Sequence, residues 1–213
     1  MTTELTRDDL LLAHAAGRLP AAIALAVDTH LALSGEARVR FATCLALGGV
    51  LLEEAEPEPL TPGAWERLER KLEREKALPG REPEPVDPRV PRPLRRLVPR
   101  GFDALPWRNL GPAQEVALPI GPPGYRARLL RLEAGRSVPR HTHEGHELTV
   151  VIEGGFTDVR GHHVRGDLVI ADPSVEHRPV ADRDGDCLCL VVTDAPLRLT
   201  GPIGRLLNPL LRI

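Results

Sequence analysis

The segment 141–147 reads His-Thr-His-Glu-Gly-His-Glu and concentrates side chains that bind metal ions. Side chains alternate between the two faces of a β-strand, so His141, His143 and Glu147 share one face if the segment is extended. A fourth histidine, His177, follows a glycine-rich turn and a short apolar run. Three imidazoles and one carboxylate form a ligand set for a divalent metal ion. The sequence therefore predicts one metal site made by these four residues.

The elements that position this segment lie in residues 99–213, where short apolar runs alternate with turn residues. This pattern is typical of a β-sandwich or β-barrel. The strands that we expect are Glu115–Leu118, Tyr125–Leu132, Glu147–Glu153, Phe156–Val159, Asp167–Ala171 and Cys187–Thr193. Gly154-Gly155 is expected to form a tight hairpin between two of them.

Other histidines and cysteines of this half receive different interpretations. His146 has the wrong parity to join the site, and His162 and His163 are expected in a turn beside Gly161. Cys187 and Cys189 lie two residues apart on one expected strand, so they share a face. Their side chains serve either as core packing or as a redox-responsive pair, and a direct disulfide on a flat strand has poor geometry.

Residues 1–80 show helical periodicity. Thr6 and Asp9 resemble a capping box, and Pro20 begins a second helix that runs to about Leu33. A third helix follows from Glu36, and Thr61 precedes a fourth. Short helices with narrow apolar faces are marginal alone, so they need one another or a partner protein. The lone histidines of these helices, His14 and His30, are expected at the surface or the core edge, and Cys44 is expected to be buried.

The segment 81–98 carries a proline at almost every second or third position, which predicts an extended linker. It divides the chain into a helical domain, 1–80, and a β domain, 99–213. The predicted fold is thus an N-terminal all-α bundle of about four helices and a C-terminal all-β barrel.

Composition excludes several classes of function. The net charge is −2, which argues against direct binding of nucleic acid. Three cysteines are too few for a disulfide scaffold. We find neither a long apolar run nor the basic start of a signal peptide, so we expect no membrane association and a cytoplasmic location. The predominance of arginine over lysine suggests a bacterial source.

The flanks of the histidine segment resemble the two cupin motifs. Gly135 precedes His141 with five residues between them, and Gly154 follows Glu147 with six between them. The second cupin motif, Gly…Pro…His, is matched by Gly166, Pro173 and His177. The resemblance implies a small antiparallel cupin barrel that holds the metal inside.

The whole chain resembles the ChrR family of cupin-containing anti-sigma factors. The segments that carry the likeness include 11–19, 29–33, 186–190 and 194–198, besides the cupin motifs and the tail 210–213. The resemblance implies a bacterial regulator whose helical domain binds an extracytoplasmic-function (ECF) sigma factor. It further implies that the cupin senses oxidative stress, of the singlet-oxygen or organic-peroxide class, and triggers release.

The chain departs from the family at the N-terminal zinc motif, His-x3-Cys-x2-Cys. Here the motif is His30-x3-Ser34-x2-Ala37, so both thiolates are missing. A hydroxyl and a methyl group cannot replace two thiolates on zinc. We therefore expect no zinc in the helical domain.

The same four cupin ligands also suit a metalloenzyme such as a dioxygenase. Zinc in four-coordination leaves no open position and favours a sensor, whereas six-coordinate iron or manganese leaves two positions for oxygen and substrate. Zinc is the expected metal, with iron, manganese and nickel as alternatives. The sensor is preferred to the enzyme because no second acid or base is evident in the barrel. The sequence leaves homo-oligomerisation open.

Overall fold

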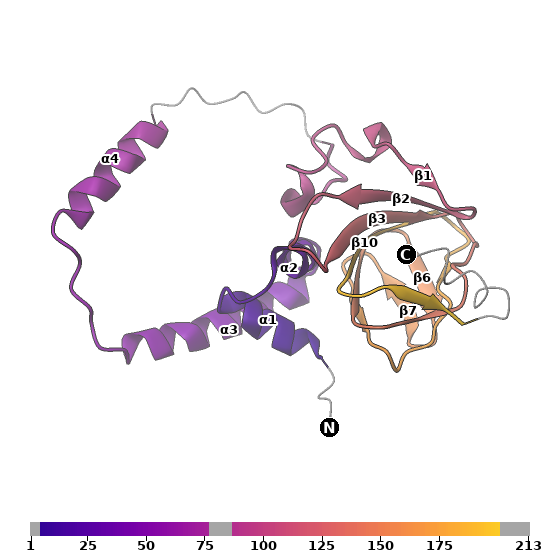
Figure 1. The fold of residues 1–213 in the computed structure, drawn as a ribbon, viewed down its shortest axis with the longest axis horizontal. Coiled ribbons are helices and arrows are strands. Elements are labelled where there is room, and N and C mark those ends of the chain that lie inside the picture. Colours follow the sequence, from indigo (N-terminus) through magenta and orange to yellow (C-terminus); the bar gives the residue numbers. More distant parts are fainter. Residues whose placement is uncertain (1–4, 77–86, 201–213) are drawn as a thin grey trace.

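The computed structural model describes residues 5–76 and 87–200. Within these residues helices come first and β-strands follow (Figure 1), which confirms the predicted fold class. The helices are α1 (Arg7–Ala15), α2 (Ala21–Leu33), α3 (Gly35–Glu53) and α4 (Ala64–Lys76). Two short 3-10 helices, Arg92–Leu94 and Phe102–Ala104, precede the strands.

Side chains at the helix starts explain where the first helices begin. The Thr6 hydroxyl accepts a hydrogen bond from the Asp9 amide at 3.2 Å, and the Asp9 carboxylate accepts one from the Thr6 amide at 3.0 Å. This confirms the expected capping box. The Ser34 hydroxyl accepts from the Ala37 amide at 3.2 Å and caps α3.

The strands form three antiparallel sheets that enclose a barrel. The six-stranded sheet has the order β1-β2-β3-β10-β5-β8, and the smaller sheets are β11-β4 and β7-β6-β9. The bounds are β1 (Arg108–Asn109), β2 (Ala113–Leu118), β3 (Arg126–Leu132), β4 (His141–His143), β5 (Glu147–Glu153), β6 (Gly155–Asp158), β7 (Gly161–Val164), β8 (Leu168–Ala171), β9 (Val180–Ala181), β10 (Cys187–Thr193) and β11 (Leu197–Leu199).

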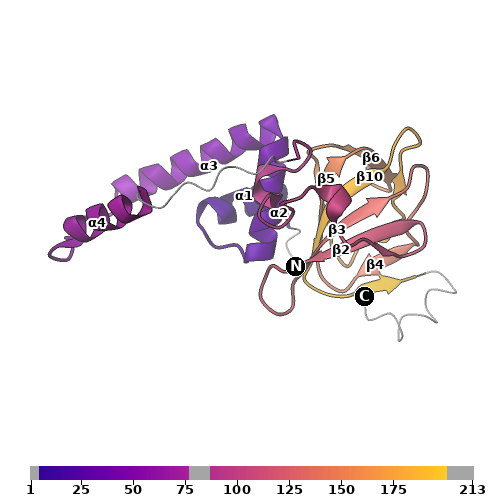
Figure 2. The same cartoon turned by 90° about the horizontal axis from the view of Figure 1, so that it is seen from above.

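Helix α2 packs on the outer face of the six-stranded sheet, and α1 packs on α2 and α3 (Figures 1 and 2). Ala26 and Val27 of α2 share one buried cluster with Leu129, Leu148 and Leu190 of the sheet. The inner face of the same strands lines the barrel with a second apolar cluster. Strands buried on both faces read as continuous apolar runs, which explains the sequences of β5 and β10.

The middle segment joins this core. Val90, Leu94 and Val98 are each at most 1% exposed, and the first 3-10 helix contacts α2. Residues 81–86 of the expected linker lie outside the described residues. The division at 80 and 98 remains a prediction, but residues 90–98 are packed rather than extended in solvent.

Several local predictions were wrong. His162 and His163 lie in strand β7, not in a turn. Gly154 does not close a hairpin, because β5 pairs with β8 and β10 while β6 pairs with β7 and β9. Gly154 instead turns the chain from one sheet to another with φ at 65°, and an added Cβ there would collide with the Asp186 carbonyl. His30 is buried rather than at the core edge, and Cys44 is only partly buried.

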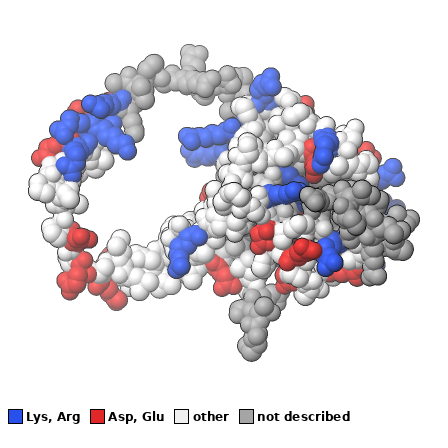
Figure 3. Space-filling view, in the orientation of Figure 1, with Lys and Arg blue, Asp and Glu red and all other residues white. Residues whose placement is uncertain are grey.

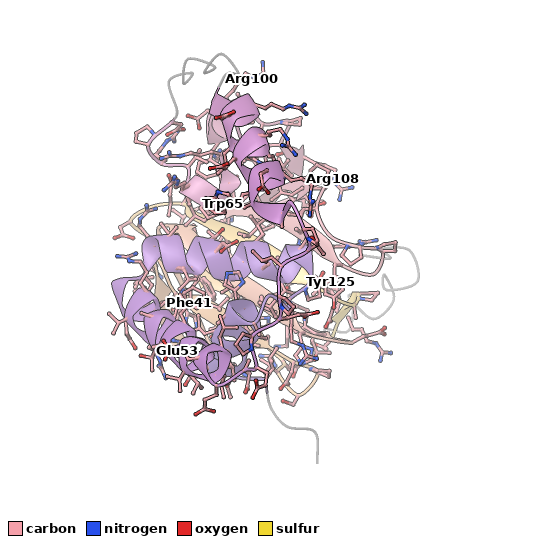
Figure 4. The ribbon with its side chains drawn as sticks, turned by 90° about the vertical axis from the view of Figure 1, so that its left-hand side faces the viewer. Phe41, Glu53, Trp65, Arg100, Arg108 and Tyr125 are labelled. Carbon is pink, nitrogen blue, oxygen red and sulfur yellow. The ribbon has the colours of Figure 1, made fainter. Side chains whose placement is uncertain are left out.

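Helices α3 and α4 extend away from the barrel as an arm (Figure 2). Phe41, at the inner end of α3, contacts the His14 ring and the core, whereas the outer half of α3 and all of α4 leave apolar side chains exposed (Figure 4). Basic side chains gather on α4 and acidic ones near its junction with α3 (Figure 3). None of the helices in the described part of the chain is long and apolar enough to cross a membrane.

Candidate metal centre

The four predicted ligands converge inside the barrel. The Nε2 atom of His177 lies 3.0 Å from Nε2 of His141 and 3.1 Å from Nε2 of His143. The Glu147 carboxylate lies 3.9 Å from His143 Nδ1 and 4.0 Å from His177 Nε2. All four side chains are buried, and one ligand atom of each lies within 4.8 Å of the others. The structure thus brings together every residue of the predicted set.

Strand pairing fixes these positions. His141 and His143 point inward from β4, and Glu147 begins β5 after a tight turn. His177 faces His141 across an isolated bridge in which each backbone amide donates to the other carbonyl at 3.0 Å. The turn needs Gly145, because an added Cβ there would collide with the Asp194 carboxylate.

Hydrogen bonds orient two of the three imidazoles. His141 Nδ1 lies 2.8 Å from the Pro139 carbonyl, and His177 Nδ1 lies 2.9 Å from the Asp158 carboxylate. Both oxygens accept, so Nδ1 carries the proton and Nε2 presents its lone pair to the centre of the cluster. His143 Nδ1 is buried and has no hydrogen-bond partner within residues 5–76 and 87–200.

Electrostatics favour neutral imidazoles beside an ionised carboxylate. Burial lowers the pKa of His143 to about 4 and also lowers the pKa of His141. Burial opposes charge on Glu147, but the neighbouring histidines and Arg128 outweigh it and hold the pKa of this carboxyl below its usual value. Metal ions bind neutral imidazole and ionised carboxylate, so the protonation states suit a cation.

The donor set fits a divalent ion. The Nε2 atoms of His141 and His177 carry no proton and cannot satisfy each other, although they lie 3.0 Å apart in a buried site. A cation placed among the three imidazoles would accept one lone pair from each ring, and Glu147 would offset part of its charge. Nitrogen and carboxylate donors suit zinc and also iron, manganese or nickel.

The remaining histidines lie apart from this cluster. His146 pairs with Asp194 at 3.2 Å, and His162 pairs with Asp182 at 2.8 Å. His14 lies 2.9 Å from Asp28. At the degenerate N-terminal motif, His30 Nδ1 is hydrogen-bonded to the carbonyl of Gly166 at 2.6 Å, so this helical histidine contacts the barrel.

Two residues of the centre were not found from the sequence. Asp158 supports His177 and also His163, whose Nε2 lies 3.1 Å from its other oxygen. No local motif marks it, since its strand was not expected to pair beside the site. Arg128 lies 3.8 Å from Glu147. Arg128 lies two and four residues before Leu130 and Leu132 on β3, so the three side chains share one face. This alternation could have predicted that Arg128 points into the barrel.

Cys187 and Cys189 share one face of β10, as their parity predicted, and this face lines the cavity. The two sulfur atoms are 3.5 Å apart and both thiols are buried. The hydrogen bond with Cys187, together with burial, raises the pKa of the Cys189 thiol. Cys189 is therefore protonated at neutral pH in this state.

The protein has two parts, a helical segment and a β-barrel on which it packs. The buried cluster of three histidines and one glutamate in the barrel is a centre of the cupin type. Residues 100–196 match the family model for the ChrR cupin-like domain. The chain is 42% identical over 209 residues to anti-sigma-E factor ChrR of Cereibacter sphaeroides, which covers 97% of this chain and 96% of that protein. The chain belongs to the ChrR family of cupin-containing anti-sigma factors.

A solved structure agrees with this assignment along nearly the whole chain. The crystal structure of Rhodobacter sphaeroides SigE in complex with the anti-sigma ChrR matches with a TM-score of 0.77 and 40% identity. The match covers 91% of this chain and 100% of that chain. The likeness therefore includes the helices as well as the barrel.

Proposed function

We propose that this protein is an anti-sigma factor that binds an ECF sigma factor through its helical domain in the bacterial cytoplasm. The observation that carries the proposal is the exposed apolar surface of α3 and α4 in a chain so similar to an anti-sigma factor. We name this surface the arm face. It consists of Leu45, Leu47, Val50, Leu51, Leu52, Trp65, Leu68 and Leu72.

The arm face has the properties of a docking surface. Trp65 is 61% exposed and Leu51 is 61% exposed, although both are large apolar side chains. On α4, Trp65, Leu68 and Leu72 follow helical spacing and form one stripe on an otherwise charged helix. Contiguous apolar surface of this kind marks a protein interface. A bound sigma factor would cover this stripe and occlude its own contacts with RNA polymerase.

The cupin would hold one divalent metal ion through His141, His143, Glu147 and His177. Zinc is the metal that we propose, because four protein ligands complete its tetrahedral site and leave no position for catalysis. A closed site of this kind suits a sensor, because oxidation of a ligand would change the metal coordination and with it the shape of the barrel. No zinc is proposed at His30, Ser34 and Ala37, where the thiolates are missing.

The signal would be an oxidant of the singlet-oxygen or organic-peroxide class. Oxidation of a histidine ligand, or of Cys187 and Cys189 on the same wall, would disturb the metal and the inner core. Strands β5 and β10 carry that wall on one face and the contact with α2 on the other. A shift of these strands would therefore displace α2 directly and lower the affinity of the helical domain for the sigma factor.

The test is co-elution with the ECF sigma factor encoded beside this protein. The two purified proteins, mixed at micromolar concentration, should elute as one complex in size exclusion and separate after peroxide treatment. Separate elution before treatment would refute the anti-sigma function. A complex that forms normally but survives both organic peroxide and singlet oxygen would refute the sensing function and leave the anti-sigma function in place.

A cupin metalloenzyme such as a dioxygenase is the alternative, favoured by one observation. His141, Glu147 and His177 line an internal cavity of about 410 Å3 that could admit a substrate. Metal analysis distinguishes the two functions. Stoichiometric zinc favours the sensor, whereas iron or nickel together with oxygen consumption would favour the enzyme.

A further inference from the structure

The barrel contains a cavity of about 410 Å3 that is partly open to solvent and lies beside the metal centre. This volume is within the range of sites that bind small molecules. The wall is mostly apolar and comes from the inner faces of β2, β3, β5, β8 and β10. Its apolar members include Leu130, Leu132, Val138, Phe156, Val169 and Val191. Such a wall gives water few partners, so an aliphatic chain would be favoured there.

One positively charged side chain, that of Arg128, lies in this wall. Arg128 projects inward from β3 and is 9% exposed. Its Nε atom is buried, and no hydrogen-bond partner for it is found among the described residues. A guanidinium group carries five donors in a planar fork, and a buried charge is costly unless it is paired. Arg128 is therefore an incompletely satisfied donor that faces an apolar space.

The acidic groups of the cavity do not complete this pairing. Glu147 lies 3.8 Å from the Arg128 Nη2 atom, which is beyond hydrogen-bond distance, and it also faces the histidine cluster. Glu115, the second carboxylate of the wall, is paired with Arg108. Thr149 donates to Glu147 at 3.4 Å rather than accepting from Arg128. The guanidinium fork thus retains donors for another anion.

We propose that the barrel binds an aliphatic monocarboxylate. The carboxylate accepts two hydrogen bonds from the Arg128 fork, and the chain lies among Leu130, Phe156 and Val191. A bidentate arginine–carboxylate pair is strong and directional in a site that excludes water. This ligand site goes beyond the proposed binding of a sigma factor and does not depend on it.

Isothermal titration of the full-length, metal-loaded protein tests the proposal with decanoate and with decanol as probes. Decanoate should bind at one site per chain, and decanol, which has the same chain length without the charge, should bind at least tenfold more weakly. Arg128→Met should reduce the affinity for decanoate at least tenfold and leave that for decanol unchanged. Arg128→Lys should restore part of the affinity, because it keeps the charge but not the fork.

Arg126→Met is the matched control, since Arg126 lies on the same strand but is exposed and outside the cavity. It should bind decanoate as the unsubstituted protein does. Equal affinities for decanoate and decanol, or no binding of decanoate, would overturn the proposal even if Arg128→Met fails to fold. Binding that survives in Arg128→Met but disappears when a chelator removes the metal would also overturn it, because the metal would then hold the carboxylate.

Discussion

Asp158 lies directly behind His177 and holds its ring in place. One carboxylate oxygen accepts a hydrogen bond from His177 Nδ1 at 2.9 Å, and the other lies 3.1 Å from His163 Nε2. The Asp158 side chain is fully buried. Burial opposes its charge, but the hydrogen bond from His177 and further donors lower the pKa of Asp158 to about 2. The centre is therefore supported by an anion that stays ionised at neutral pH.

Asp158→Asn should weaken metal binding by roughly 10- to 100-fold, because an amide no longer fixes the tautomer of His177. Competition with a chelating dye measures this affinity. Asp182→Asn is the matched control, since Asp182 pairs with the exposed His162 away from the centre. Equal effects of the two substitutions would show that Asp158 has no special role at the metal.

The metal-free protein should lose stability as the pH falls from 7 to 4.5. The pKa of His143 is about 4 in the folded state and 6.5 when unperturbed, so the unfolded chain binds the proton first. This histidine alone should lower the free energy of unfolding by about 2 kcal/mol over that interval. Urea unfolding at the two pH values measures it.

His143→Gln provides the control for that pH dependence. Its free energy of unfolding should change by about 2 kcal/mol less over the same interval, because the titrating group is gone. An identical pH dependence in the variant and the unsubstituted protein would mean that His143 does not titrate in this way.

Trp65→Ala should weaken binding of the ECF sigma factor by at least 30-fold, since an exposed tryptophan at an interface commonly carries about 2 kcal/mol. The side chain is 61% exposed, so its loss should leave folding unchanged. Surface plasmon resonance with the immobilised sigma factor gives the affinity. Val159→Ala, on the barrel and 70% exposed, should bind normally. Normal binding by Trp65→Ala would exclude this part of the arm face from the interface.

His30→Leu should lower the free energy of unfolding by about 1–3 kcal/mol, because the buried carbonyl of Gly166 would lose its partner. His14→Leu should cost less, since its partner Asp28 is 48% exposed. Urea unfolding of the metal-loaded protein compares the two. A larger effect at His14 would contradict the importance of the contact between α2 and the barrel.

Cys187 and Cys189 should react with iodoacetamide at least tenfold more slowly than Cys44. Both are buried, and the hydrogen bond between them and burial raise the pKa of Cys189, whereas Cys44 is only partly buried. Mass spectrometry of tryptic peptides follows the three rates, which should become similar in guanidinium chloride. Rapid labelling of the pair in the native protein would indicate that this wall of the barrel opens readily.

The metal cluster could be predicted from the sequence because the alternation of strands places His141, His143 and Glu147 on one face. The longer strands were found because each is an apolar run between turn residues, and β5 and β10 were predicted with the observed bounds. Short strands such as β1 and β9, of two residues each, carry too few side chains to show alternation. They depend on pairing with segments that are distant in sequence.

Burial against another part of the fold could not be predicted from local pattern. Val90 and Leu94 lie in a proline-rich segment that was interpreted as a linker, yet they belong to the buried cluster that α2 forms with the sheet. The sequence around His30 predicts a polar helix end, but His30 is hydrogen-bonded to the carbonyl of Gly166, which lies 136 residues away in the chain. Each of these positions is decided by tertiary contact rather than by helix or strand periodicity.

The apolar outer face of the barrel limits how this protein can evolve. Leu129, Leu148 and Leu190 are fully buried beneath the helices, where a free-standing barrel would present polar residues to water. A recombination event that joined these helices to an unrelated cupin would leave both surfaces uncovered. The two halves of the gene must therefore be inherited, and altered, as a matched pair.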